Sequence, residues 1–282
     1  METDVKQLRK SFYMALLWLL LILVVAVGAT YAWFTGAGRA STYVTPTGGT
    51  ISEGDTSLLI SKNHGGPFDK KCELPTGKTD TLKPLSTADL KHFYKATTQN
   101  KKGISILFAN ADGRMEQDAV HGTVYLKCEN ASCDVYFNKK ELNLGNNAQA
   151  LAAMRLGLRI TSSAGTSTRV FKLDGLKGAS GVKSKATIAR RNAVVSSVSA
   201  GGQPVFVKDP GKAITTYMAQ TGKSEKEYNR GADSLVQLNA GEIATVEYWL
   251  YLEGCDEQCY NPVQNIASQI RLAFAGVDTA KK

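Results

Sequence analysis

An uncharged apolar run near the N-terminus limits what this chain can fold into more than any other feature of its sequence. The run covers residues 11–38, and its central part, residues 14–27, is almost wholly aliphatic. A helix that crosses a membrane needs about 20 apolar residues, which this run supplies. Lys6, Arg9 and Lys10 precede the run, and basic residues on that flank keep the N-terminus in the cytoplasm. We therefore predict that the run enters the membrane and that the later residues lie on the extracellular side.

The fate of this N-terminal segment has two interpretations. Thr30 and Ala32 place small residues at the first and third positions of a signal-peptide site, so that cleavage after Ala32 is one of them. Tyr31, Trp33 and Phe34 form an aromatic group that would suit the interfacial belt of a retained anchor. The sequence favours neither, so the protein is predicted to be membrane-anchored or secreted after cleavage.

The chain is predicted to have three parts. Residues 1–34 form the signal or transmembrane segment, and residues 35–49, rich in Gly, Ser and Thr, form a linker or an extended arm. Residues 50–282 are long enough to bury a sizeable core, and we expect one ectodomain there. Four residues give the arm aromatic or β-forming side chains: Trp33, Phe34, Tyr43 and Val44. We predict that this arm can add as a strand to the sheet edge of another copy.

Alternation of apolar side chains with a period of two marks the clearest predicted strands. Neighbouring side chains of a strand point to opposite faces, so a sheet with one buried face requires this pattern. Four stretches show it: residues 119–128, 154–160, 243–252 and 266–274. In the second stretch, the core face consists of Met154, Leu156, Leu158 and Ile160. Two shorter β-like runs cover residues 57–61 and 103–109.

Helical signals are few. Ser86 and Asp89 have spacing like that of a capping box ahead of an apolar group, which predicts a short helix over residues 86–94. A second helix-like piece lies near residues 215–228, inside a Gly-, Ser- and Lys-rich stretch at about residues 161–240 that we interpret as an insertion. Repeated β–α alternation is absent from the sequence pattern. The predicted fold is therefore mainly β, an antiparallel β-sandwich of jelly-roll-like type with minor short helices.

The five cysteines predict disulfides if the domain is exported. Cys128 with Cys133, and Cys255 with Cys259, would each close a very short loop. A zinc ion held by both pairs is the less favoured alternative, because structural zinc loops usually have Cys-x-x-Cys spacing. Cys72 is left over, as a thiol or as an intermolecular link.

The formal net charge of +9 invites polyanionic partners. Outside the cell these are anionic wall polymers, acidic polysaccharides or anionic lipids, and nucleic acid is not expected. The lysines are spread along the sequence instead of forming one block, so a diffuse solubilising charge is the favoured interpretation. The membrane itself is a predicted partner through the N-terminal segment.

Catalytic patterns are lacking in the sequence. The three histidines are far apart: His64, His92 and His121. None belongs to a His-Glu-x-x-His motif, and no Gly-x-Ser-x-Gly elbow is present, so we predict no enzyme activity, no cofactor and no metal. Glu253, Asp256 and Glu257 follow a predicted strand and are a calcium-binding alternative, but a solvated acidic turn is the favoured interpretation.

Several short runs, in their order along the chain, carry a resemblance to a known family. They are GATYAWFTG, PLSTADLKHFY, VYLKC, AMRLGLRI, VEYWLYLEGCDEQCYN and IRLAFAG. Together they resemble exported Gram-positive surface proteins related to the TasA and camelysin biofilm-matrix group. The resemblance implies a jelly-roll sandwich and, for some members, assembly into extracellular fibres after the leader is cleaved. The long middle stretch, the cysteines and the basic charge depart from the matrix proteins.

Two functions follow as hypotheses. The first is a non-enzymatic structural or adhesive protein of the cell surface or matrix, which assembles by strand addition. The alternative is a monomeric, membrane-anchored extracellular domain that binds a wall polymer or another ligand. Removal of the leader separates them, because a polymer needs release and an anchored receptor needs retention.

Overall fold

The computed structural model divides the chain into two compact units, Met1–Ala40 and Ser41–Lys282. It describes residues 14, 18, 44–46, 49–51, 58–72, 74, 82–99, 106–144, 148–176, 193–221, 228–229, 233–256, 258–259 and 268–279. In the first unit these are Met14 and Trp18, both helical and exposed. Within the described residues, no helix has the length and apolar character needed to span a membrane. The predicted leader as a whole, the cleavage position at Ala32, and Trp33, Phe34 and Tyr43 of the arm lie outside the described residues.

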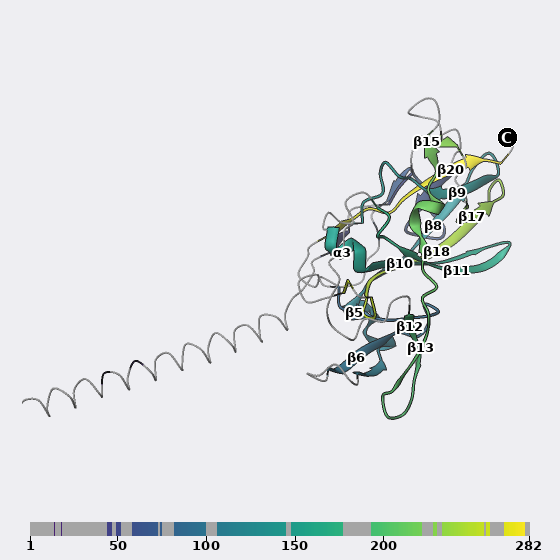
Figure 1. Ribbon diagram of the computed structural model, residues 1–282. Helices are drawn as coiled ribbons and strands as arrows, with labels where there is room; N and C mark the ends of the chain where they lie inside the picture. The colour runs from purple at the N-terminus through teal and green to yellow at the C-terminus, as the bar shows by residue number, and fades with distance from the viewer. Residues whose placement is uncertain are drawn as a thin grey trace, which may run out of the picture. The chain divides into compact units, whose positions relative to one another are not determined.

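The larger sheet of the second unit has seven strands (Figure 1). Their order is β14 (Lys212–Ala213), β11 (Gly165–Lys172), β10 (Met154–Ser162), β18 (Ile243–Glu253), β8 (Val120–Cys128) and β3 (Leu58–Ser61), and β5 (Pro84–Leu85) also pairs with β18. The central pairs, from β11 to β3, are antiparallel. β14 and β5 join in parallel, so the sheet is mixed.

The smaller sheet has five strands and contains segments from both ends of the unit. Their order is β17 (Val236–Leu238), β9 (Cys133–Phe137), β20 (Ala273–Asp278), β2 (Gly49–Ile51) and β4 (Lys71–Cys72). β2 is parallel to β20 and antiparallel to β4. Just before it, β1 (Val44–Pro46) is parallel to β19 (Ser268–Ile270). The early strands of the domain thus lie alongside its last strands.

One hydrophobic core contains side chains from both sheets. The rings of Phe137 on β9 and Phe171 on β11 meet edge to face, with centroids 5.2 Å apart, and Phe137 also stacks on Phe274 of β20. The apolar faces predicted for residues 119–128, 154–160 and 243–252 belong to this core. The prediction of a mainly β fold, and of these three strands, is therefore confirmed.

The opposite face of the seven-stranded sheet is covered as well. A second cluster joins Trp249 and Tyr251 of β18 to Leu90, Phe93 and Met115 from the segment before β8. This layer includes two hairpins, formed by β6 (Tyr94–Gln99) with β7 (Ile106–Asn110), and by β12 (Ala193–Val198) with β13 (Pro204–Lys208). We call this side of the sheet the outer face. Its cover is incomplete, which leaves room for the site described below.

The disulfide between Cys128 and Cys133 is present and confirms that prediction. It joins the end of β8 to the start of β9, at the crossover from one sheet to the other. Cys255 and Cys259 are not joined to each other in the structure, and their pairing stays a prediction, as does the fate of Cys72.

Three predicted elements were wrong in detail. Residues 88–92 form bends instead of a helix, and Ser86 and Tyr94 on either side pair with each other as an isolated β-bridge. The predicted helix near residues 215–228 is a short 3-10 helix, η2 (Ile214–Tyr217), followed by the small strands β15 (Gln220–Thr221) and β16 (Tyr228–Asn229). The predicted strand over residues 266–274 is divided into β19 and β20, which pair with different strands.

The other helices among the described residues of the second unit are short, and the middle stretch of the chain takes part in both sheets. These helices are η1 (Asp112–Arg114), α2 (Met115–Asp118) and α3 (Ala148–Ala153). From the stretch interpreted as an insertion, residues 161–240, β11 and β14 pair in the larger sheet and β17 pairs in the smaller one. Part of that stretch is therefore integral to the domain.

Candidate functional site

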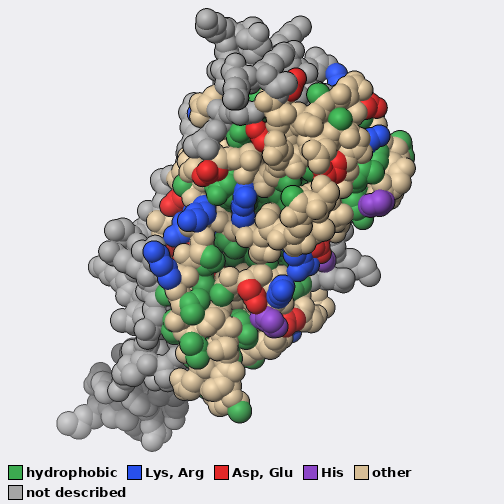
Figure 2. Space-filling view, turned by 90° about the vertical axis from the view of Figure 1, so that its right-hand side faces the viewer, with side chains coloured by type: hydrophobic (Ala, Val, Ile, Leu, Met, Phe, Trp, Pro, Cys, Tyr) green, Lys and Arg blue, Asp and Glu red, His purple; other side chains and the backbone are tan. Residues whose placement is uncertain are grey.

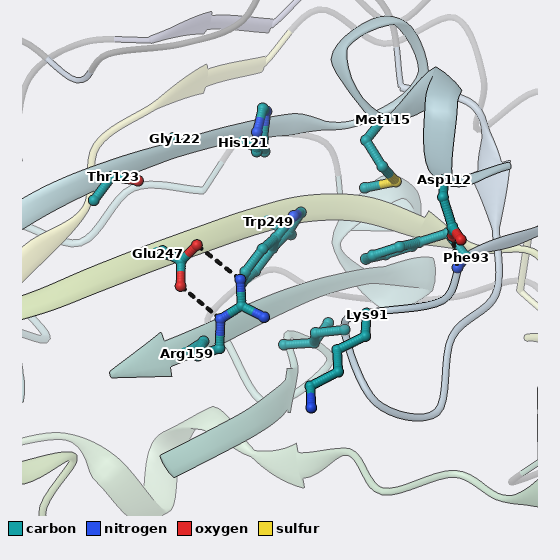
Figure 3. Close-up of a pocket in the computed structure, with 11 residues that line it drawn as sticks. Lys91, Phe93, Asp112, Met115, His121, Gly122, Thr123, Arg159, Glu247 and Trp249 are labelled. Carbon is teal, nitrogen blue, oxygen red and sulfur yellow. Dashed lines mark hydrogen bonds and ion pairs between the residues drawn. The ribbon is translucent and has the colours of Figure 1, made fainter. Parts of the chain in front are cut away.

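A pocket of about 390 Å³ opens on the outer face of the seven-stranded sheet. We call it the outer-face pocket. The side chains that line it come from β8, β10 and β18 and from the segment before β8 (Figure 3): Leu90, Lys91, Phe93, Asp112, Met115, His121, Gly122, Thr123, Arg159, Glu247 and Trp249. Figure 2 shows one face of the domain, where hydrophobic side chains reach the surface among scattered basic and acidic groups.

The floor of the pocket is set by the register of three strands. Trp249 of β18 lies opposite His121 of β8, and Glu247 lies between Thr123 of β8 and Arg159 of β10. Arg159 donates to Glu247 twice, from Nε at 2.5 Å and from Nη2 at 2.7 Å. Its guanidinium also lies 5.1 Å from the ring centroid of Trp249. Two parallel hydrogen bonds and the ring hold this arginine in one orientation.

The rim of the pocket is a loop held by its own side chains. The hydroxyl of Thr87 accepts from the Leu90 amide at 3.0 Å, and Asp89 Oδ1 accepts from the amides of Lys91 and His92, both at 2.9 Å. Such side-chain bonds compete with helix formation, which explains why the predicted helix is missing. The hydrogen bond that the imidazole donates to Asp89 raises the pKa of His92. Opposing the effect of burial, the His92 hydrogen bonds hold the pKa of Asp89 below its ordinary value.

Leu90 holds an unusual backbone conformation, with φ of 56°, which few residues other than glycine adopt. Its side chain lies directly above Gly157 of β10, where an added Cβ would come within 2.5 Å of a Leu90 methyl carbon. Gly157 is paired with Trp249 of β18. Glycine at this position therefore lets the rim loop approach the sheet beside the pocket.

His121 contributes an unsatisfied polar atom to the pocket wall. Its ring stacks on Trp249 with centroids 6.5 Å apart and planes 28° from parallel. Its Nδ1 atom is buried, and no described residue forms a hydrogen bond with it. A buried polar atom without a partner costs free energy, so this nitrogen leaves an unsatisfied group in the pocket wall.

A second polar group on the outer face is fully enclosed, and we call it the buried ionic cluster. Arg155 of β10 has 3% of its side chain exposed and donates from Nη2 to Asp209 at 3.3 Å and to Asp256 at 2.5 Å. Lys172 of β11 also pairs with Asp209, at 3.1 Å. Glu253, at the end of β18, is buried beside them. These charges neutralise one another and tie three separate segments together.

Burial sets the protonation of this cluster. Against the effect of burial, the carboxylates around Arg155 raise the pKa of its guanidinium. Burial raises the pKa of Glu253 to about 8, although the Ser86 hydroxyl and the Cys255 amide donate to its carboxyl group. The interpretation of this acidic segment as a solvated turn was wrong for Glu253, which is buried. Asp256 keeps 15% of its side chain exposed and pairs with Arg155. Within the described residues no group of His, Cys, Asp and Glu is arranged to hold a metal ion; Glu257 is not among those residues.

A second recess, of about 330 Å³, lies between edges of the two sheets. We call it the edge groove. Its walls are the β10–β11 hairpin and the segment around β17. Arg169 of β11 spans it by donating to the Ser234 carbonyl at 2.6 Å. On the edge of β11 that faces away from β10, the only described backbone partner is β14, which pairs at Phe171 and Lys172.

Most residues of the outer-face pocket were missed from the sequence. Arg159 stands between core positions of its strand, a pattern that by itself indicates no site. Val44 of the predicted arm is described and lies in β1, paired with Ser268. The three histidines lie in separate places, beside Tyr125, Asp89 and Trp249. A signal was present: Glu247 and Trp249 alternate with core residues, but only the strand register shows that they face Arg159 and His121.

The comparisons with known proteins do not name a relative. No family model, no curated protein and no solved structure matches this chain. The resemblance to exported matrix proteins stays a prediction.

Proposed function

We propose that the protein is a non-enzymatic, exported protein of the cell surface or matrix, whose β domain assembles by strand addition. The observation that carries this proposal is the pairing of β1 and β2 with β19 and β20. The segment that follows the apolar run provides strands to a sheet. It is short, comes from one end of the chain, and forms backbone hydrogen bonds that an identical segment from another copy would reproduce.

When copies exchange this segment, the backbone hydrogen bonds that are broken within one copy form again between two copies. β2 lies between β20 and β4 in the five-stranded sheet. If β1 and β2 leave, they expose the backbone groups of β19 and β20, and the same segment of a second copy satisfies those groups in the same register. Swapping identical elements is a low-cost route to assembly. When each copy donates to the next instead of back to its donor, the product is an open fibre.

Two further observations support export and assembly. The Cys128–Cys133 disulfide suits an oxidising compartment, and the uncharged run of residues 11–38 supplies a route across the membrane. At the edge groove, most of β11 has no partner among the described strands on the edge away from β10, so another chain could add there as a strand. We take the two sheets with their shared core as a sandwich of jelly-roll type, whose edges are the sites of assembly.

The test is a pair of engineered cysteines across the exchanged strands. Thr45 of β1 lies directly opposite Gln269 of β19, a separation that a disulfide can bridge. In a strain that exports the full-length protein, we expect T45C/Q269C to give a ladder of covalent multimers on non-reducing gels. The ladder should collapse to monomer on reduction, because each link joins the β1 of one copy to the β19 of the next.

The matched control places cysteines within one hairpin. Thr161 and Thr166 lie opposite each other in β10 and β11, so T161C/T166C should link only within a chain and run as a monomer. The protein without engineered cysteines controls for links through Cys72. Monomer alone from T45C/Q269C, with the link shown to be closed within one chain, would contradict assembly through these strands.

The second candidate function is a monomeric, membrane-anchored domain that binds a wall polymer or another ligand. The outer-face pocket favours it, because an opening with several polar groups and aromatic walls is typical of binding sites. Membrane fractionation with N-terminal sequencing separates the two candidates. A mature N-terminus near Trp33 in the soluble fraction supports release and assembly, and an intact N-terminus in the membrane supports the anchored domain.

A further inference from the structure

We propose that the outer-face pocket is a saccharide-binding site that takes one uncharged, hydroxyl-bearing ring of a surface polysaccharide. This inference deepens the second candidate function by naming its site and ligand class. It does not depend on strand exchange, because the pocket is built from β8, β10, β18 and the rim loop, none of which belongs to the exchanged segment.

The pocket offers both donors and acceptors within one small recess. Arg159 uses Nε and Nη2 for Glu247, which leaves further N–H groups on its guanidinium. The carboxylate oxygens of Glu247 keep lone pairs, and the Thr123 hydroxyl can donate or accept. A sugar hydroxyl also donates and accepts, so neighbouring hydroxyls can engage an arginine–carboxylate pair without breaking it.

The buried Nδ1 atom of His121 adds a second, independent indication of a ligand. It lines the pocket, yet it forms no hydrogen bond with any described residue. The contact with Trp249 sets the ring plane, and a flip of the imidazole within this plane exchanges the positions of Nδ1 and Cδ2. We infer that such a flip turns the nitrogen towards the pocket, where a hydroxyl can satisfy it as donor or as acceptor.

The remaining walls suit the carbon face of a sugar ring. Trp249, Phe93 and Met115 give apolar surface next to the polar groups (Figure 3). Small-molecule sites combine such apolar walls with a few placed polar groups, and their volumes start at about 300 Å³. The volume of about 390 Å³ therefore matches a small ligand or one unit of a polymer.

The charges of the pocket argue against a small anion. Arg159 is neutralised by Glu247, and Lys91 shares the lining with Asp112. The lining therefore has two basic and two acidic side chains. A phosphate or a carboxylate would need a net positive site, whereas an uncharged polyhydroxyl compound needs the mixture of donors and acceptors that is present.

Tryptophan fluorescence tests the proposal directly. The chain has three tryptophans, at positions 18, 33 and 249, so the full-length W18F/W33F protein in detergent reports from the pocket alone. We would titrate it with maltose, lactose, chitobiose and glucuronic acid. We expect a saturable change with at least one uncharged disaccharide and weaker binding of glucuronic acid. No change with any disaccharide, or tighter binding of glucuronic acid, would overturn the proposal.

A matched pair of histidine variants locates the binding. H121F keeps a ring against Trp249 but removes the orphaned nitrogen, and loss of one hydrogen bond should weaken binding by about tenfold. H64F is the control, because His64 makes a similar ring contact with Tyr125 outside the pocket. T123V removes one hydroxyl from the pocket and tests the site in the same way if H121F does not fold. Wild-type affinity in the folded pocket variants would refute the site.

Discussion

Two arginines on one strand have opposite surroundings. Arg155 and Arg159 are four residues apart on β10, so both point to the outer face of the sheet. Arg155 is enclosed with Asp209 and Asp256, whereas a quarter of the Arg159 side chain is exposed at the pocket, beside Glu247. The strand supplies the same residue type to the same face in both places. What differs is the layer that covers them.

The segments that cover the outer face determine whether the ion pairs of each arginine are buried or accessible. The segments that contain Asp209 and Asp256 close over Arg155, and once covered this charge needs every partner that it has. The rim loop that contains Leu90 covers the sheet as far as Gly157 and leaves Arg159 accessible. We therefore expect the buried ionic cluster to determine stability and the outer-face pocket to determine binding.

The largest expected effect comes from the enclosed arginine. R155M should destabilise the domain by about 3–5 kcal/mol, because Asp209 and Asp256 lose their buried partner. R159M is the matched variant and should cost no more than about 1 kcal/mol, since its ion pair with Glu247 is partly exposed. Urea unfolding followed by circular dichroism measures both. Equal costs would break the distinction between the two arginines.

The next effect is a dependence of stability on pH through Glu253. Burial raises its pKa to about 8 in the folded protein, and the folded state therefore holds this proton more tightly than the unfolded state does. Its contribution is complete below the ordinary glutamate pKa, about 4.3, and is lost as the pH rises through 8. E253Q stays neutral, so its unfolding midpoint should fall less between these pH values. Parallel pH profiles of the two proteins would count against a buried, protonated Glu253.

A smaller effect is expected at the glycine between the two arginines. G157A would place a methyl group against the side chain of Leu90, and overpacking of this kind costs about 1–3 kcal/mol. Displacement of the rim loop should also change the fluorescence of Trp249. G113A is the control, because a Cβ there meets nothing within 4 Å. An unchanged melting temperature and emission spectrum for G157A would show that the loop does not rest on the sheet.

The smallest effect concerns the rim itself. The hydrogen bond that His92 donates to Asp89 raises the pKa of His92, so this pair stabilises the loop at low pH and loses that contribution as the pH rises through the pKa of the folded histidine. D89N should lower the pKa of His92 towards its ordinary value, as measured by NMR titration of the imidazole. D69N, at a distant turn, should leave that pKa where it is. A His92 pKa unmoved by D89N would remove Asp89 as its partner.

The sequence predicts the inner half of this architecture better than the outer half. Alternation identified β8, β10 and β18 because their inner faces are uniformly apolar, and the short spacing of Cys128 and Cys133 identified their link. The outer face carries charged residues whose partners are distant in sequence. Arg155 alternates with the core positions of its strand, and its partner Asp209 is 54 residues away in sequence, so a local sequence pattern cannot show that the two side chains pair.

Local signals also failed where side chains replaced backbone partners. Ser86 and Asp89 had the spacing of a helix cap, but Thr87 and Asp89 satisfy the amides of the loop without a helix. The apolar alternation over residues 266–274 continues across the break between β19 and β20. The spacing of apolar residues gives no information about the partner strand of each half, so the break could not be predicted from it. The pocket arises at the meeting of such segments, so its residues could not be grouped before the register was known.

The Cys128–Cys133 disulfide joins two cysteines that come before several strands of both sheets in the sequence. Both cysteines precede β10, β18 and β20, so the bridge can close while much of each sheet has yet to be synthesised. A closed bridge holds the ends of β8 and β9 together at a turn of fixed length. β18 and β20, which come later in the chain, pair with β8 and β9, so an early bridge would hold one partner strand of each sheet in place for them.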